Sequence, residues 1–449
     1  MGSLYHTLST LVYYVMVSAD NINREPCRGW LMLGVYSLSL SGILSIFIVF
    51  LRIPFFKSMI QNADRVFDLS LVIHVNLSVL VWLCSMLSII VSMTIQEKTK
   101  YFSRAWILSS VGTILIVLSA LSTHAHPIKN NYVPVIDNST FFAGLTLFFS
   151  GVVFNTMPLL RRTNILTSSP LSAGVYGIAA MLSSVLLCFI TAHAVTTRNT
   201  DPLSFYEQVF WGSGHLLQGV FSQAFLVALL FDMKSCRLTH PYILSMVFLT
   251  NTVAIMLASA SHIIYPNDFE ALSVFFTWHM RIAESVVPLF LIFFTIANIK
   301  PLFYRMHRHI LYSSLMFIYG SVLGVLSMDG TVTIPAHYHG CVVGMTVAFM
   351  GFVYGMLPKL GYQSVPIKLG NMQLGLYSVG QAMHITGLEL LGGYGALRKV
   401  TFLPDTASKI AKHCFSLGGA IAILGGLMFV LLVLAHIYGH KKQISKMED

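Results

Sequence analysis

The sequence predicts an all-α, polytopic membrane protein with twelve transmembrane helices. Hydrophobic residues fill 55% of its 449 positions and charged residues only 10%, whereas a soluble domain carries about 25% charged residues. A spanning helix needs about 20 mostly apolar residues, and short connections separate the apolar runs. In chain order, we place the helices at residues 30–51, 68–94, 105–123, 140–160, 172–194, 205–231, 241–263, 273–297, 309–326, 337–358, 374–392 and 416–437.

Little of the chain lies outside this helical domain, which covers residues 30–437. Residues 1–29 contain a short apolar run at 8–19 with no Lys or Arg before it, so the basic start of a signal peptide is missing. We expect residues 1–29 to form an interfacial or partner-docking segment. Residues 438–449 form a C-terminal tail.

The basic residues predict the orientation of the helices. Most of the 27 Lys and Arg residues fall on the termini and the even-numbered loops, and basic residues are enriched on the inner side of a membrane. Both termini are therefore expected on the inner side. The formal net charge of +10 reflects this topology and contact with anionic lipid, so no nucleic-acid partner is expected.

Histidines inside the predicted spans are the most informative residues. His337 and His339 are one residue apart at the start of a helix, and positions i and i+2 of a helix face nearly opposite sides. An intramembrane histidine is costly and is a functional candidate, so this pair could ligate two haems, one on each face. His74, His215 and His262 fall at the same outer depth. Any one of the five could be an ordinary buried histidine, but the whole set fits that alternative poorly.

The cysteines exclude some cofactors. All six are isolated in the sequence, without a C-x-x-C or C-x-x-C-H motif. The chain therefore lacks the usual attachment site for c-type haem and a site for copper between paired cysteines. A covalently bound haem or a paired-cysteine copper centre would have to belong to a partner subunit.

Four motifs in order along the chain resemble the catalytic subunit I of the haem–copper respiratory oxidases. The strongest is His337-Tyr338-His339 followed by residues 351–360 (GFVYGMLPKL), similar to the family's H-x-H pair and its aromatic run closing on Pro-Lys. The others are residues 72–76 (VIHVN), 210–215 (FWGSGH) and 393–399 (GYGALRK). The resemblance covers nearly the full twelve-helix length.

The resemblance implies two haems, expected to be b-type. His74 and His339 would be the axial ligands of a low-spin haem, and His337 would be the single axial ligand of a high-spin haem with an open face. Arg398, and with it Lys399, would neutralise the haem propionates; the alternative for these two is an ordinary solvated loop.

The resemblance also implies a second metal, copper or iron, held by His215 and His262 opposite the high-spin haem. Oxygen-reducing members carry adjacent histidines on helix seven, but here Ser261 precedes His262. Three imidazoles suit copper, so another residue, water or an oxygen-preferring metal would have to complete the site. Possible supporting residues are Glu284, His279 and Gln218; for Glu284 we slightly favour a plain i,i+3 ion pair with Arg281.

The expected substrate is a diatomic gas. Oxygen reductases of the family use a tyrosine on helix six or seven, cross-linked to a metal-ligand histidine, and no tyrosine stands at either place here. Reducing two NO molecules to N2O takes two electrons and needs no such donor. The resemblance therefore implies a terminal respiratory reductase leaning to NO, with cytochrome c oxidase activity on O2 as the alternative.

Partners and rival classes follow from the same resemblance. Electrons would come from cytochrome c or from a copper- or haem-bearing partner subunit, in a bacterial inner membrane or an equivalent energy-transducing membrane. A twelve-helix secondary transporter is the rival class, but transporters usually show repeats and broken helices near the midplane, and the sequence shows neither clearly. An inactive haem-binding homologue is the third possibility.

Overall fold

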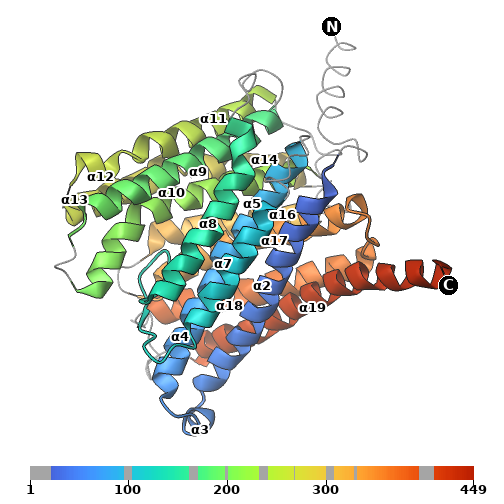
Figure 1. Ribbon diagram of the computed structural model, residues 1–449, viewed down its shortest axis with the longest axis horizontal. Helices are drawn as coiled ribbons and strands as arrows, with labels where there is room; N and C mark the ends of the chain where they lie inside the picture. Colours follow the sequence, from blue (N-terminus) through green and yellow to red (C-terminus); the bar gives the residue numbers. More distant parts are fainter. Residues whose placement is uncertain are drawn as a thin grey trace.

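The computed structural model describes residues 22–95, 104–160, 170–197, 201–231, 241–266, 268–299, 308–327, 331–393 and 409–448. Within these residues the protein is a bundle of helices with one short β-hairpin (Figure 1). Ten helical segments are long and apolar enough to cross a membrane. An all-α, polytopic membrane protein is therefore confirmed.

Each of the twelve predicted ranges overlaps helix in the structure. Two of these helices are not among the ten: α7 is short, and α18 is long but less apolar. The principal helices are α2 (Arg24–Leu51), α4 (Ala63–Val75), η2 (Asn76–Val81), α5 (Trp82–Thr94), α7 (Ala105–Ser119), α8 (Ser139–Leu160), α9 (Pro170–Val195), α10 (Pro202–Leu230), α11 (Pro241–Ala258), α12 (Ser261–Ile264), α13 (Phe269–Ile282), α14 (Val286–Ala297), α16 (Arg308–Leu326), α17 (Thr333–Lys359), α18 (Ile367–Gly393) and α19 (Lys409–Glu448), with α3 (Pro54–Lys57) as a single turn.

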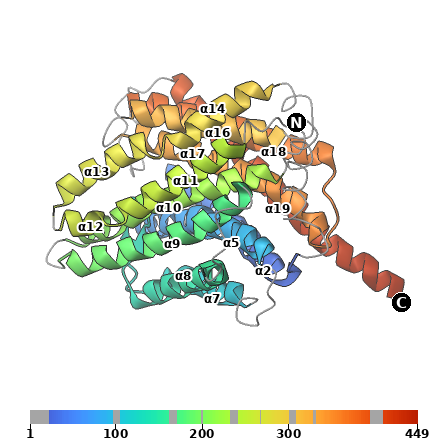
Figure 2. The same cartoon turned by 90° about the horizontal axis from the view of Figure 1, so that it is seen from above.

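The ends of the bundle differ in extent from the predicted domain. Helix α2 begins at Arg24, inside the range 1–29, and residues 1–21 lie outside the described part. Helix α19 continues to Glu448, through most of the range assigned to a tail, and projects from the bundle (Figures 1 and 2).

Neighbouring helices pack in pairs, and α10 lies at the centre. The closest pairs are α18 with α19, α16 with α17, α7 with α8 and α9 with α10, and α10 also contacts α5, α11, α13 and α17. Small residues allow helix backbones to meet inside a membrane. At Gly112 of α7, an added Cβ would lie only 2.4 Å from the backbone nitrogen of Phe148 on α8.

Three spanning segments are irregular. The segment of α11 and α12 is interrupted at residues 259–260, directly before Ser261 and His262. The π-helix η2 interrupts the segment of α4 and α5 two residues after His74, and such insertions are frequent at functional sites. The segment of α13 and α14 is broken at residues 283–285. Pro288 explains the break, because it has no N–H for the carbonyl of Glu284 and its ring crowds that carbonyl. The expectation of no clearly broken helix was wrong here.

Candidate functional site

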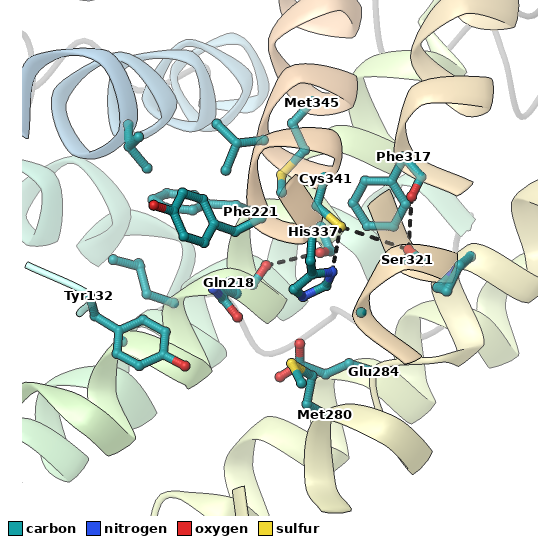
Figure 3. Close-up of a pocket in the computed structure, with 18 of the residues that line it drawn as sticks. Tyr132, Gln218, Phe221, Met280, Glu284, Phe317, Ser321, His337, Cys341 and Met345 are labelled. Carbon is teal, nitrogen blue, oxygen red and sulfur yellow. Dashed lines mark hydrogen bonds between the residues drawn. The ribbon is translucent and has the colours of Figure 1, made fainter. Parts of the chain in front are cut away.

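A cavity of about 350 Å³ lies where α10, α13, α14, α16 and α17 meet η2 and the hairpin (Figure 3). Its volume is within the usual range for small-ligand sites. Most of its lining is apolar. The residues beside His74 (Val75 and Asn76), the residue before His215 (Gly214) and His337 itself all line it. Residues next to His74 and His215 thus border the same cavity as His337.

His337 is held against α16 by a close helix contact. An added Cβ at Gly320 would lie 2.3 Å from the backbone nitrogen of Cys341, so α16 and α17 approach backbone to backbone. His337 Nδ1 lies 2.7 Å from the carbonyl oxygen of Gly320. The carbonyl only accepts, so Nδ1 carries the proton. Nε2 keeps its lone pair and has no hydrogen bond to the described residues.

His74 and His339 share this arrangement. His74 Nδ1 lies 2.9 Å from the carbonyl oxygen of Ser41 on α2, and His339 Nδ1 lies 2.8 Å from that of Pro335. Each ring therefore presents an Nε2 that makes no hydrogen bond to the described residues. The ring of His384 lies 6.1 Å from that of His339.

These three rings fit axial haem ligation. A metal-bound histidine usually donates its second ring N–H to a carbonyl or carboxylate, which fixes the tautomer and the ring orientation. His74, His337 and His339 already make that bond to backbone carbonyls. His337 and His339, two positions apart on α17, also lie in different surroundings. His337 lines the cavity, whereas the ring of His339 packs beside those of Tyr338 and His384.

His215 is engaged at both ring nitrogens. Its Nδ1 lies 2.9 Å from the carbonyl oxygen of Trp211, so Nε2 is the acceptor. The hydroxyl of Tyr132 lies 2.7 Å from that Nε2 and donates to it. Tyr132 also lines the cavity. The family resemblance points to helices six and seven for a tyrosine, and nothing in the sequence links a loop residue to His215.

The tip of a β-hairpin carries Tyr132. Strands β1 (Pro127–Ile128) and β2 (Val135–Ile136) pair antiparallel, with Pro127 opposite Ile136. Side chains of α4, η2 and α10 hold the hairpin in place. The contacts are the ion pair Lys129–Asp68 at 2.9 Å, the bond from Asn131 to Glu207 at 3.0 Å, and the bond from Asn76 to the Pro134 carbonyl at 2.7 Å.

His262 lies against α10 but not with His215 in a completed metal site. An added Cβ at Gly212 would lie 2.8 Å from His262 Nε2, and that buried nitrogen has no hydrogen-bond partner among the described residues. The buried hydroxyl of Ser261 also has no hydrogen-bond partner among the described residues. In the described part of the chain, no group of three or more His, Cys, Asp or Glu side chains is arranged to hold a metal. Tyr132 occupies Nε2 of His215, so of this pair His262 presents the unpartnered ring nitrogen, and the second metal stays a prediction.

The broken helix brings a carboxylate to the cavity. Glu284 lines it, and Glu284 Oε1 lies 3.5 Å from His279 Nδ1. The predicted Arg281–Glu284 ion pair was wrong: Arg281 lies over the ring of Trp278, 5.8 Å from its centroid. The break at residues 283–285 explains the difference, since positions i and i+3 share a face only within a continuous helix.

The remaining predicted residues divide between the cavity and the part of the chain outside the described residues. Gln218 of α10 lines the cavity, one turn after His215 (Figure 3). Arg398 and Lys399 lie outside the described residues, so the predicted propionate contacts stay a prediction.

Two bacterial proteins are similar to the chain over most of its length. An uncharacterized protein of Rickettsia prowazekii is 27% identical over 91% of this chain and 95% of its own length. An uncharacterized protein of Aquifex aeolicus is 23% identical over 77% of this chain and 87% of its own length. No family model matches the sequence. The similarity covers most of the chain and most of each relative, but both relatives are themselves uncharacterized and indicate no activity.

Proposed function

We propose that the chain is the catalytic subunit of a membrane-bound terminal reductase, similar to subunit I of the haem–copper oxidases, with twelve spanning helices and both termini inside. In this proposal His74 and His339 hold a low-spin haem, and His337 holds a high-spin haem beside the cavity. One observation carries it. All three imidazoles donate Nδ1–H to a backbone carbonyl and keep Nε2 for a metal.

The bound haems would supply electron transfer and, at the open face, coordination of a diatomic gas. The residues of the chain then have separate tasks. The carbonyl of Gly320 orients the His337 ring, and the glycines of α16 allow that ring to approach. The apolar cavity wall excludes water from the gas site, which strengthens every polar contact made inside it.

The rim of the cavity supports a gas as substrate. Leu289, Val322 and Val325 line the cavity and are 52%, 50% and 74% exposed on the outside of the bundle. In a membrane these positions on α14 and α16 face hydrocarbon, where NO and O2 dissolve readily. A transporter site needs access to water on both sides instead. The interrupted segments of α11–α12 and α13–α14 are features that favour the transporter class.

We propose NO as the gas, reduced in pairs with two electrons and two protons to N2O and water. O2 is the second candidate, and Tyr132 favours it, because a phenol hydrogen-bonded to His215 at the cavity supplies what helices six and seven lack. An inactive haem-binding homologue is the third reading. In all three, cytochrome c or a copper- or haem-bearing subunit is the proposed donor, and a bacterial inner membrane is the proposed location.

Optical spectroscopy of the purified membrane protein tests the proposal. Two haems are expected after reduction, and CO should shift the spectrum of only one. Turnover on NO and on O2 then identifies the substrate. Haem without turnover on either gas would indicate the inactive homologue. A protein that binds no haem when haem is supplied during expression would contradict the proposal and favour the transporter class.

A further inference from the structure

The polar side chains that line the cavity are mostly committed to other partners. Tyr132 donates its proton to His215. The amide nitrogen of Asn76 donates to the carbonyls of Val72 and Pro134. The remaining hydroxyls donate to helix carbonyls: Ser222 to Gln218, Ser285 to Ile282 and Ser321 to Phe317. Each of these groups already donates its hydrogen to a protein acceptor and has none left to donate to a ligand.

The other polar residues of the lining are poor donors to a ligand beside His337. Tyr338 lines the cavity, but its ring stacks on that of His339, with centroids 5.0 Å apart. Arg281 is exposed and lies over Trp278. Glu284 has no hydrogen to donate when ionised. Cys341 contacts Ser321 and is at most a weak donor.

Gln218 is different. It is partly exposed, it lines the cavity, and its side-chain amide makes no hydrogen bond to the described residues. In the view of Figure 3 it lies between Tyr132 and His337. An amide presents two N–H donors and one acceptor, and a polar group in an apolar cavity is costly unless it finds a partner. The amide of Gln218 is therefore a hydrogen-bond donor in the cavity that a polar ligand would satisfy.

We propose that Gln218 is the residue that binds and positions the diatomic ligand, through a hydrogen bond from its amide nitrogen. This inference rests on the proposed function, because it needs a haem on His337. A gas coordinated by reduced haem gains negative charge, and a donor in an apolar pocket stabilises that charge. His215 cannot do this, since Tyr132 occupies its acceptor nitrogen.

The infrared C–O stretch of the CO complex tests the proposal in the full haem-loaded protein. Gln218→Met keeps the approximate shape of the side chain but removes the amide donor; Gln218→Leu is a second variant if the first does not take up haem. A donor beside CO lowers its stretching frequency, so both variants should raise it. The dissociation constant for O2 or NO should rise about five-fold, the ratio expected for one hydrogen bond of average strength.

Ser222→Ala is the matched control, because Ser222 lines the same cavity one turn further along α10 and its hydroxyl donates to a helix carbonyl. Its C–O band should stay at the wild-type frequency. An unchanged band in Gln218→Met with normal haem content would overturn the role of Gln218 and leave the proposed function standing. Stoichiometric non-haem copper or iron together with that unchanged band would assign the position to a metal instead. A wild-type protein without haem would overturn both.

Discussion

Gly320→Ala should separate α16 from α17 and detach His337. The added Cβ would lie 2.3 Å from the backbone nitrogen of Cys341, and carbon contacts are favourable only at about 3.5–4.0 Å, so the helices must move apart by about 1 Å. The 2.7 Å bond from His337 to the Gly320 carbonyl would then exceed hydrogen-bonding distance. Overpacking costs about 1–3 kcal/mol, and the lost bond adds about 1 kcal/mol.

Thermal unfolding in detergent and the CO difference spectrum measure the two effects separately. Gly320→Ala should unfold at a lower temperature and lose the CO-reactive haem, while the low-spin haem stays. Gly42→Ala is the control, because nothing lies within 4 Å of its added Cβ; it should be neutral or slightly stabilising. If Gly320→Ala has the wild-type melting temperature and CO spectrum, the backbone contact does not position His337.

Three further substitutions test other parts of the structure. His337→Ala should abolish the CO-reactive haem signal and spare the low-spin one; loss of both would refute separate roles for the histidines of α17. Tyr132→Phe leaves a buried imidazole nitrogen without its donor and should cost about 1–3 kcal/mol without raising the bound metal measured by elemental analysis. Asn155→Leu removes the acceptor of Trp30 and Ser92 and should lower the unfolding temperature, since two buried donors lose their partner.

The sequence predicts the helices well because a membrane span is a local property. Length and apolar composition suffice for a run such as Arg24–Leu51, and the structure has helix there. The predicted span at 374–392 likewise lies within helix α18, although the composition of α18 is less apolar. The local interruptions were harder to predict. The π-helix η2 depends on how neighbouring helices satisfy freed backbone groups, whereas the break at residues 283–285 has a local cause in Pro288 that the sequence analysis did not use.

The histidines of the candidate site could be predicted from the sequence, but the residues that contact them could not. His74, His337 and His339 stand out because a histidine in a span is rare. Tyr132 does not, since its role depends on a hairpin that folds back onto α10. The pairing of Glu284 was missed for the same reason: i,i+3 spacing predicts contact only if the helix continues. Spacing predicts neighbours within an element, whereas tertiary contacts require the fold.

The hairpin connects the surroundings of the two proposed haems. Asn76, two residues after His74, holds the carbonyl of Pro134, and Pro134 is two residues from Tyr132, which holds His215. The π-helix that begins at Asn76 replaces the regular i to i+4 bonds of an α-helix in this segment. A displacement of α4 would therefore reach the cavity wall through a short, hydrogen-bonded path. The surroundings of the two proposed haems are in this sense one mechanical unit.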